Sequence, residues 1–177
     1  PLTFYLDIEC FDKLKKENIV ANYSSFDIKL RDTSITSDSE LFLPITLNKG
    51  LTVLDEDKNK KFISENNHDF LEETSLIKIL KANDEYLRPT MLAHSKYDYI
   101  MGSKESTTPF RYDVNYRNYF VVLNGKAKVK LSPPKSKKYL HNIKDYDNFE
   151  FKSPINPWDI QEEYKTDFDK IKCMDVI

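Results

Sequence analysis

Residues 118–131 constrain the fold most strongly, because they have the pattern of two β-strands joined by a tight turn. Asn124 and Gly125 stand at the centre, and this dipeptide favours the type I′ turn of a two-residue hairpin. In the register that the turn sets, Lys126, Lys128 and Lys130 share one face, which is expected to lie in solvent or, alternatively, to be a docking patch. The opposite face is expected to be buried and carries Asn118, Phe120, Val122, Ala127, Val129 and Leu131.

The composition indicates a globular protein with its own core. The chain has 177 residues, 40% of them hydrophobic and 13% aromatic, and this length favours a single domain. The net charge of −2 argues against a general attraction to nucleic acid or anionic membranes. The sequence shows no membrane segment and no signal peptide. Cys10 and Cys173 are too few for a disulfide framework, so we expect an intracellular or virion protein that is not secreted.

Other segments show the periodicities of helices and strands. Residues 66–83 have the clearest helical pattern, with an apolar stripe at Leu76, Ile77 and Leu80. Asn67 or Asp69 is expected to cap the first turn of this helix. The remaining expected elements are a short helix that begins near residue 9 and strands at residues 2–8, 26–30, 41–43, 97–101, 107–114 and 170–177.

Residues 107–120 contain a second, more specific pattern. The sequence Thr-Pro-Phe-Arg-Tyr-Asp at 108–113 is followed by Asn-Tyr-Phe at 118–120, by the expected hairpin and by two prolines at 133–134. This arrangement resembles the metal-binding strand of the JmjC/cupin-like iron dioxygenases, whose pattern is T-P-x-H-x-D followed by N-[FY]-F. The similarity covers residues 97–134 with a weaker continuation to residue 177, whereas residues 1–90 match no family known to us.

The resemblance implies a mostly β fold of the α+β class. Residues 91–177 would form the first half of a JmjC/cupin-like double-stranded β-helix, and residues 1–90 would supply strands and helices packed outside it. The chain, residues 1–177, is expected to be one domain that is truncated at both ends. The strand expected at residues 170–177 has no turn after it, and a strand without a partner exposes an edge that stable domains avoid.

The resemblance also implies a metal site. Iron(II)/2-oxoglutarate oxygenases hold iron with two histidines and one carboxylate. The first histidine and the carboxylate lie two residues apart on one strand, so that both point the same way. Here Asp113 occupies the carboxylate position, but Arg111 occupies the histidine position, and the second histidine would lie beyond residue 177. A guanidinium stays protonated and cannot be a metal ligand, so Arg111 and Asp113 are interpreted as a vestigial metal site.

The fate of Arg111 allows two predictions. In the first, the guanidinium forms a buried ion pair with Asp113 or another acid in the former metal pocket. In the alternative, a shifted strand turns Arg111 toward solvent or a neighbouring subunit. A double-mutant cycle on Arg111 and Asp113 distinguishes the two predictions.

The positions that would bind 2-oxoglutarate are only partly kept. In the oxygenase relatives, a threonine before the proline, the asparagine of N-[FY]-F and an inward lysine on the second hairpin strand contact this cosubstrate. Thr108 and Asn118 match the first two positions, but the lysine position is Ala127. Lys126 and Lys128 flank Ala127 and face the other way in the expected register. Thr108, Asn118 and Ala127 are therefore interpreted as a vestigial cosubstrate site.

The altered positions Arg111 and Ala127 favour a protein that is not an enzyme and has no cofactor. The remaining histidines, His68, His94 and His141, are isolated in the sequence. Similar cupin-like sequences occur in large DNA viruses, and 23 of the 27 basic residues here are lysine, which suits such an origin. We expect a structural or binding module, a minor capsid-associated virion component whose partners are capsid or other virion proteins. The alternative is a hydroxylase that depends on Fe(II) and 2-oxoglutarate and uses atypical ligands.

Overall fold

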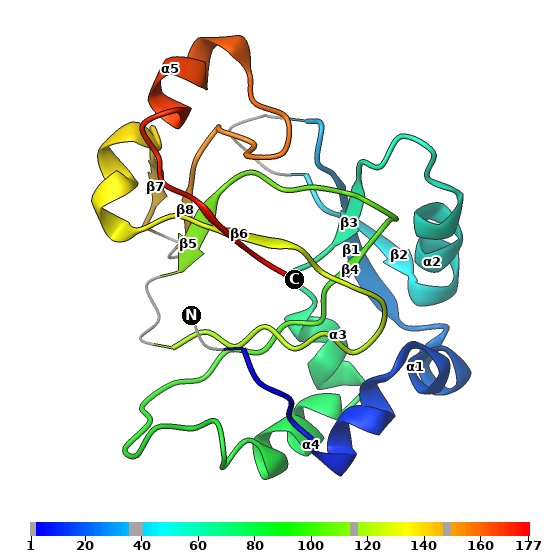
Figure 1. Ribbon diagram of the computed structural model, residues 1–177. Coiled ribbons are helices and arrows are strands. Elements are labelled where there is room, and N and C mark those ends of the chain that lie inside the picture. The colour runs from blue at the N-terminus through cyan, green and yellow to red at the C-terminus, as the bar shows by residue number, and fades with distance from the viewer. Residues whose placement is uncertain (1–2, 36–40, 114–116, 147–149) are drawn as a thin grey trace. The chain divides into compact units, whose positions relative to one another are not determined.

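Short strands and short helices alternate along the chain in the computed structural model, which describes residues 3–35, 41–113, 117–146 and 150–177 (Figure 1). The strands form three small antiparallel sheets, so that the fold is α+β. The chain divides into two units, Pro1–Ser106 and Thr107–Ile177. The four-stranded sheet belongs to the first unit, and the three-stranded and two-stranded sheets belong to the second.

The sheet of the first unit has the strand order β2-β1-β3-β4. Its central strand β1 pairs with β2 on one side and with β3 on the other, both antiparallel. The strands are β1 (Asp27–Asp32), β2 (Leu43–Thr46), β3 (Phe62–Ser64) and β4 (Met101–Gly102). The helices of this unit are the 3-10 helix η1 (Glu9–Leu14), α1 (Lys16–Tyr23), α2 (Leu47–Glu56), α3 (His68–Glu73) and α4 (Leu76–Asn83).

The core of the first unit is built on β1, at the position where the sequence predicts a strand. Alternation along β1 buries Ile28 and Leu30. Helix α2 approaches this strand at Gly50, where an added Cβ would lie 2.6 Å from Ile28 Cδ1. The absence of a side chain at Gly50 therefore allows the close packing of α2 on β1. The same glycine weakens the helical pattern, since glycine is a poor helix former, and α2 was not predicted from the sequence.

The helix expected at residues 66–83 is divided into α3 and α4. Ser75 lies between them with a φ of 59°, in the left-handed region, which interrupts a right-handed helix. Leu76 and Ile77 are buried, as the apolar stripe predicts, and Leu80 is half-buried. Asn67 precedes α3 as expected of a cap, but its side chain forms no capping hydrogen bond.

The side chain of Asn67 instead joins three segments of the first unit. It is 1% exposed, and its Oδ1 accepts a hydrogen bond from the amide of Lys29 on β1 at 2.8 Å. Its Nδ2 donates to Ser64 Oγ at 2.8 Å and to the carbonyl of Tyr99 at 2.7 Å. Asp98 accepts from the amide of Asn67 at 2.7 Å. Asn67 therefore fastens β1, β3 and the segment that leads to β4 to one another.

The second unit contains two sheets. Strand β8 (Glu150–Lys152) lies between β5 (Arg111–Asp113) and β7 (Ile143–Asp145), and β6 (Val129–Leu131) pairs with β9 (Met174–Val176). The connections contain the 3-10 helices η2 (Pro134–Tyr139) and η3 (Glu162–Tyr164) and the helix α5 (Lys165–Phe168). The buried apolar side chains of this unit are Leu140, Phe151, Ile155 and Ile171.

The structure differs from several expectations about the fold. The described residues form neither a closed barrel nor a double-stranded β-helix. Residues 3–8 contain no strand, and β4 pairs with β3 and so completes the sheet of the first unit. The strand expected at 170–177 is the shorter β9, and β6 is its partner. No helix in the described part of the chain is both long and apolar enough to cross a membrane.

Candidate functional site

Strand β5 carries the expected metal-site positions. Tyr112 stacks on Phe151 of β8, with ring centroids 4.8 Å apart and ring planes 10° apart, and Phe151 is buried. Because side chains alternate along a strand, the side chain of Arg111 projects from the opposite face of this sheet. Arg111 is exposed and lies opposite Lys152 in the register. The position that the resemblance gives to a histidine therefore holds an exposed cation, with a second cation on the neighbouring strand.

Arg111 is exposed, so the prediction that its guanidinium is buried is wrong. The physical reason is the face of β5 on which Arg111 lies, since the side chain that packs against the buried Phe151 is Tyr112, on the opposite face of the strand. The side chain of Asp113 lies outside the described part of the structure. An ion pair between Arg111 and Asp113 therefore stays a prediction.

The three positions expected to bind a cosubstrate do not lie on paired strands. Thr108 precedes β5 and is half-buried, Asn118 is exposed, and Ala127 is half-buried. Residues 117–128 contain no strand, so that no pairing sets Asn118 and Ala127 on a common face. The expected cosubstrate site thus lacks the hairpin on which its geometry depends.

The hairpin prediction is wrong, because β6 pairs with β9 and not with residues 118–123. Phe120 and Val122, which were expected to be buried, are 61% and 49% exposed. The assignment of faces also fails at Lys130, whose side chain is only 18% exposed. Gly125 does adopt the positive φ of a turn, at 77°. Asn124 does not have the positive φ that a type I′ turn requires at both central positions, so the expected turn is not formed. Pairing between distant segments decides which strands form the sheet.

A cluster of lysines and an aromatic ring surrounds Asp175 on β9. Asp175 forms ion pairs with Lys128 at 3.0 Å and with Lys130 at 2.8 Å. Both ammonium groups also lie over the ring of Trp158, 5.3 Å and 5.0 Å from its centroid. Hydrogen bonds from Lys130 and Lys128 lower the pKa of Asp175 below its ordinary value. Two of the three lysines expected to face outward therefore link β6, β9 and the Trp158 segment.

The histidines do not assemble a metal centre in the described residues. His141 Nε2 lies 2.8 Å from Asp167 Oδ2, and Asp167 also accepts from Lys170 at 2.9 Å. Hydrogen bonds from Lys170 and then His141 lower the pKa of Asp167. No group of three or more His, Cys, Asp or Glu residues suited to a metal ion occurs among the residues that the structure describes.

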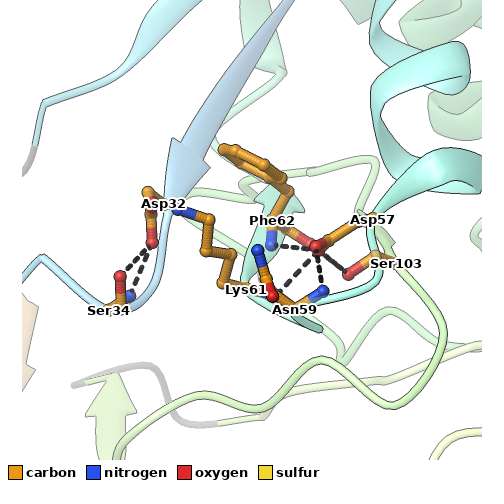
Figure 2. A network of polar contacts seen from close by, with 7 residues as sticks. All are labelled: Asp32, Ser34, Asp57, Asn59, Lys61, Phe62 and Ser103. Carbon is orange, nitrogen blue, oxygen red and sulfur yellow. Dashed lines mark hydrogen bonds and ion pairs between the residues drawn. The ribbon is translucent and has the colours of Figure 1, made fainter.

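Four hydrogen bonds hold the carboxylate of Asp57, at the end of α2 (Figure 2). Its Oδ2 accepts from Ser103 Oγ at 2.6 Å and from the amides of Lys61 at 2.7 Å and Phe62 at 2.9 Å, and its Oδ1 accepts from the amide of Asn59 at 2.9 Å. Burial raises the pKa of Asp57, but these hydrogen bonds outweigh it and lower the pKa to about 2. A carboxylate held ionised in this way is no proton donor at neutral pH.

The network around Asp57 continues through Lys61 to Asp32 on β1. Lys61 Nζ donates to Asp32 Oδ2 at 2.5 Å, while the backbone amide of Lys61 binds Asp57 (Figure 2). Asp32 Oδ1 also accepts from the amide and hydroxyl of Ser34, at 2.9 Å and 2.5 Å. The network thus ties α2, β1, β3 and the Ser103 turn together. Its donors are backbone amides and side chains of the same unit, which indicates a structural role.

The first unit also contains a buried ion pair. Arg31 Nε lies 2.5 Å from Glu65 Oε1, and the two side chains are only 8% and 1% exposed. This pair was not predicted, because a charged residue next to an alternating strand pattern is expected to lie in solvent. Each charge compensates the burial of the other, and removal of one partner alone would leave a buried charge uncompensated.

A run of exposed apolar side chains follows β5 in the second unit. Tyr119, Phe120, Val121 and Val122 are 45%, 61%, 41% and 49% exposed. We call these four residues the apolar segment. Contiguous exposed apolar residues are uncommon on monomeric proteins and mark sites of interaction with other proteins. The sequence patterning placed half of these side chains in a core, so the segment was not predicted as a binding surface.

Comparisons with known proteins add no relative. The chain matches no protein-family model, and no curated protein matches it. The similarity to JmjC/cupin-like dioxygenases therefore stays an expectation from the sequence pattern of residues 97–134.

Proposed function

We propose that this protein is a degenerate JmjC/cupin-like module that binds other proteins and catalyses no reaction. The observation that carries the proposal is the state of Arg111. It is an exposed cation opposite Lys152, at the position where the resemblance requires a neutral imidazole. A guanidinium stays protonated and cannot be a metal ligand. Ala127, which has no charge to offer a cosubstrate carboxylate, supports the same conclusion.

The partial cupin-like fold belongs to this proposal. The resemblance requires the Arg111 and Asp113 positions to lie on one strand, and β5 contains both. In the proposal, β5 and the strands that pair with it or follow it are the remnant of a double-stranded β-helix. The module keeps this framework and no longer has the iron chemistry that the framework supports in its relatives.

The partners in this proposal are proteins of a virion. The apolar segment supports a protein partner, because four consecutive apolar side chains are exposed there. The net charge of −2 gives no general attraction to nucleic acid. A capsid or another virion protein that covers the apolar segment would remove this surface from water.

The catalytic part of the proposal is tested with the full chain supplied with Fe(II), ascorbate and 2-oxoglutarate. We expect no formation of succinate above a metal-free control. Formation of succinate that is abolished by Asp113→Ala would contradict the proposal and establish the hydroxylase alternative. A working 2-oxoglutarate oxygenase assayed in parallel serves as the positive control.

The binding part is tested by incorporation into purified particles of the virus that encodes the chain. We expect the double variant Phe120→Asp/Val122→Asp to be incorporated less than the wild type. Tyr86→Asp is the matched control, because Tyr86 is 78% exposed and does not belong to the apolar segment. Absence of the wild-type protein from the particles, or equal incorporation of all three proteins, would refute a virion role through this segment.

A further inference from the structure

A groove in the first unit has no part in the proposed function. Its volume is about 440 Å³, and it lies between the first residue of α3, the middle of α4 and residues 93–96. The groove is open to solvent, and Lys81, His94 and Lys96 on its walls are exposed. The polar side chains that line it are basic or neutral: His68, Lys81, His94, Ser95 and Lys96.

The two lysines of this groove are not paired with acidic side chains. Lys81 and Lys96 form no ion pair with any residue that the structure describes. A cavity lined by charges of one sign concentrates its field on a ligand of opposite sign. Five other lysines of the same unit are each paired with a carboxylate: Lys15 with Asp12, Lys16 with Asp55, Lys29 with Asp69, Lys60 with Glu105 and Lys61 with Asp32.

His68 adds an incompletely satisfied group to the groove. Its Nε2 lies 3.5 Å from Glu72 Oε1, one turn along α3, a distance at which an ion pair is weak. Its Nδ1 is buried and has no hydrogen-bond partner among the described residues. A buried polar atom without a partner is costly to the fold. A rotation of the ring that turns a nitrogen toward a bound anion would satisfy it.

We infer that this groove binds the phosphate group of a small phosphomonoester. Lysine ammonium groups act as point charges, and two of them together with a hydroxyl and imidazoles can reach separate oxygens of a tetrahedral phosphate. A planar carboxylate is matched better by the fork of an arginine, and the groove has none. The site lies in the first unit and does not depend on Arg111, so it can be tested separately from the proposed function.

The three histidines of the chain provide an internal control for the test. Two of them, His68 and His94, line the groove, and His141 lies in the second unit. The full chain is titrated with inorganic phosphate and with adenosine monophosphate at constant pH and ionic strength, and the histidine ring signals are followed by NMR. We expect saturable shifts of His68 and His94 and none of His141. Shifts of all three together, or of none, would overturn the inference.

Paired lysine variants separate the groove from the general charge of the protein. Lys81→Met/Lys96→Met should weaken binding of both probes about tenfold or more, which corresponds to about 1.4 kcal/mol. Lys49→Met/Lys58→Met removes the same charge at exposed positions outside the groove and should change affinity less than twofold. Equal losses in the two variants would refute a site. Tighter binding of a single-stranded oligonucleotide than of adenosine monophosphate would also overturn the inference, in favour of a nucleic-acid backbone.

Discussion

Replacement of Asn67 by alanine should destabilise the first unit strongly. The substitution removes three buried hydrogen bonds and leaves the amide of Lys29 and the carbonyl of Tyr99 without these partners. Each hydrogen bond contributes about 1 kcal/mol, and a stranded buried group costs about 1–3 kcal/mol. We therefore expect Asn67→Ala to lower the free energy of unfolding by about 3–5 kcal/mol. For a unit of this size the melting temperature would fall by roughly 12 °C or more.

The assay for Asn67→Ala is urea and thermal unfolding followed by far-ultraviolet circular dichroism. Asn22→Ala is the matched control, because Asn22 is exposed on α1 and its side chain binds only the carbonyl of Asn18, one turn earlier, at 2.8 Å. This control should change the free energy of unfolding by no more than about 0.5 kcal/mol. A loss below about 1 kcal/mol for Asn67→Ala, or a loss equal to the control's, would refute the role assigned to Asn67.

Two further predictions concern Asp57 and the apolar segment. The pKa of Asp57 is lowered to about 2 from 3.8, so the stability that its ionised form contributes is complete above about pH 4 and is lost as the pH falls toward 2. Asp57→Asn should therefore flatten the fall of the unfolding free energy with pH in this range, and an unchanged profile would contradict the network. Phe120→Ala should cost less than about 0.5 kcal/mol and the buried Phe151→Ala about 3–5 kcal/mol, measured by Trp158 fluorescence in urea. Equal costs would show that Phe120 is a core residue after all.

The elements that the sequence predicted well are those whose burial is decided locally. The alternating residues 26–30 are found in β1, and the apolar positions Leu76 and Ile77 are buried in α4. Asn67 was predicted to cap a helix, but its side chain forms no capping hydrogen bond and instead binds residues elsewhere in the unit. A capping role follows from neighbouring residues, whereas its actual partners Lys29 and Tyr99 are more than 30 positions away.

The failures come from contacts between distant segments. The Asn-Gly turn favours a hairpin, but the pairing of β6 with β9 joins residues about 45 positions apart and leaves Phe120 exposed. Gly50 weakened the helical pattern of α2 in the sequence, so α2 was not predicted. The glycine is explained by the close packing of α2 against Ile28. In the candidate site, the replacement of histidine by Arg111 was visible in the sequence. The sequence left its exposure open, because the side of β5 that packs on the buried Phe151 is decided by pairing with the distant strand β8.

The metal content of the purified protein tests the central claim most directly. After incubation with Fe(II), Mn(II) or Ni(II) and removal of the excess, elemental analysis should find far less than one transition-metal ion per chain. The reason is that an arginine occupies the position of a required neutral ligand. One metal ion per chain, lost in the Asp113→Ala variant, would contradict the account and show a working metal centre built on β5.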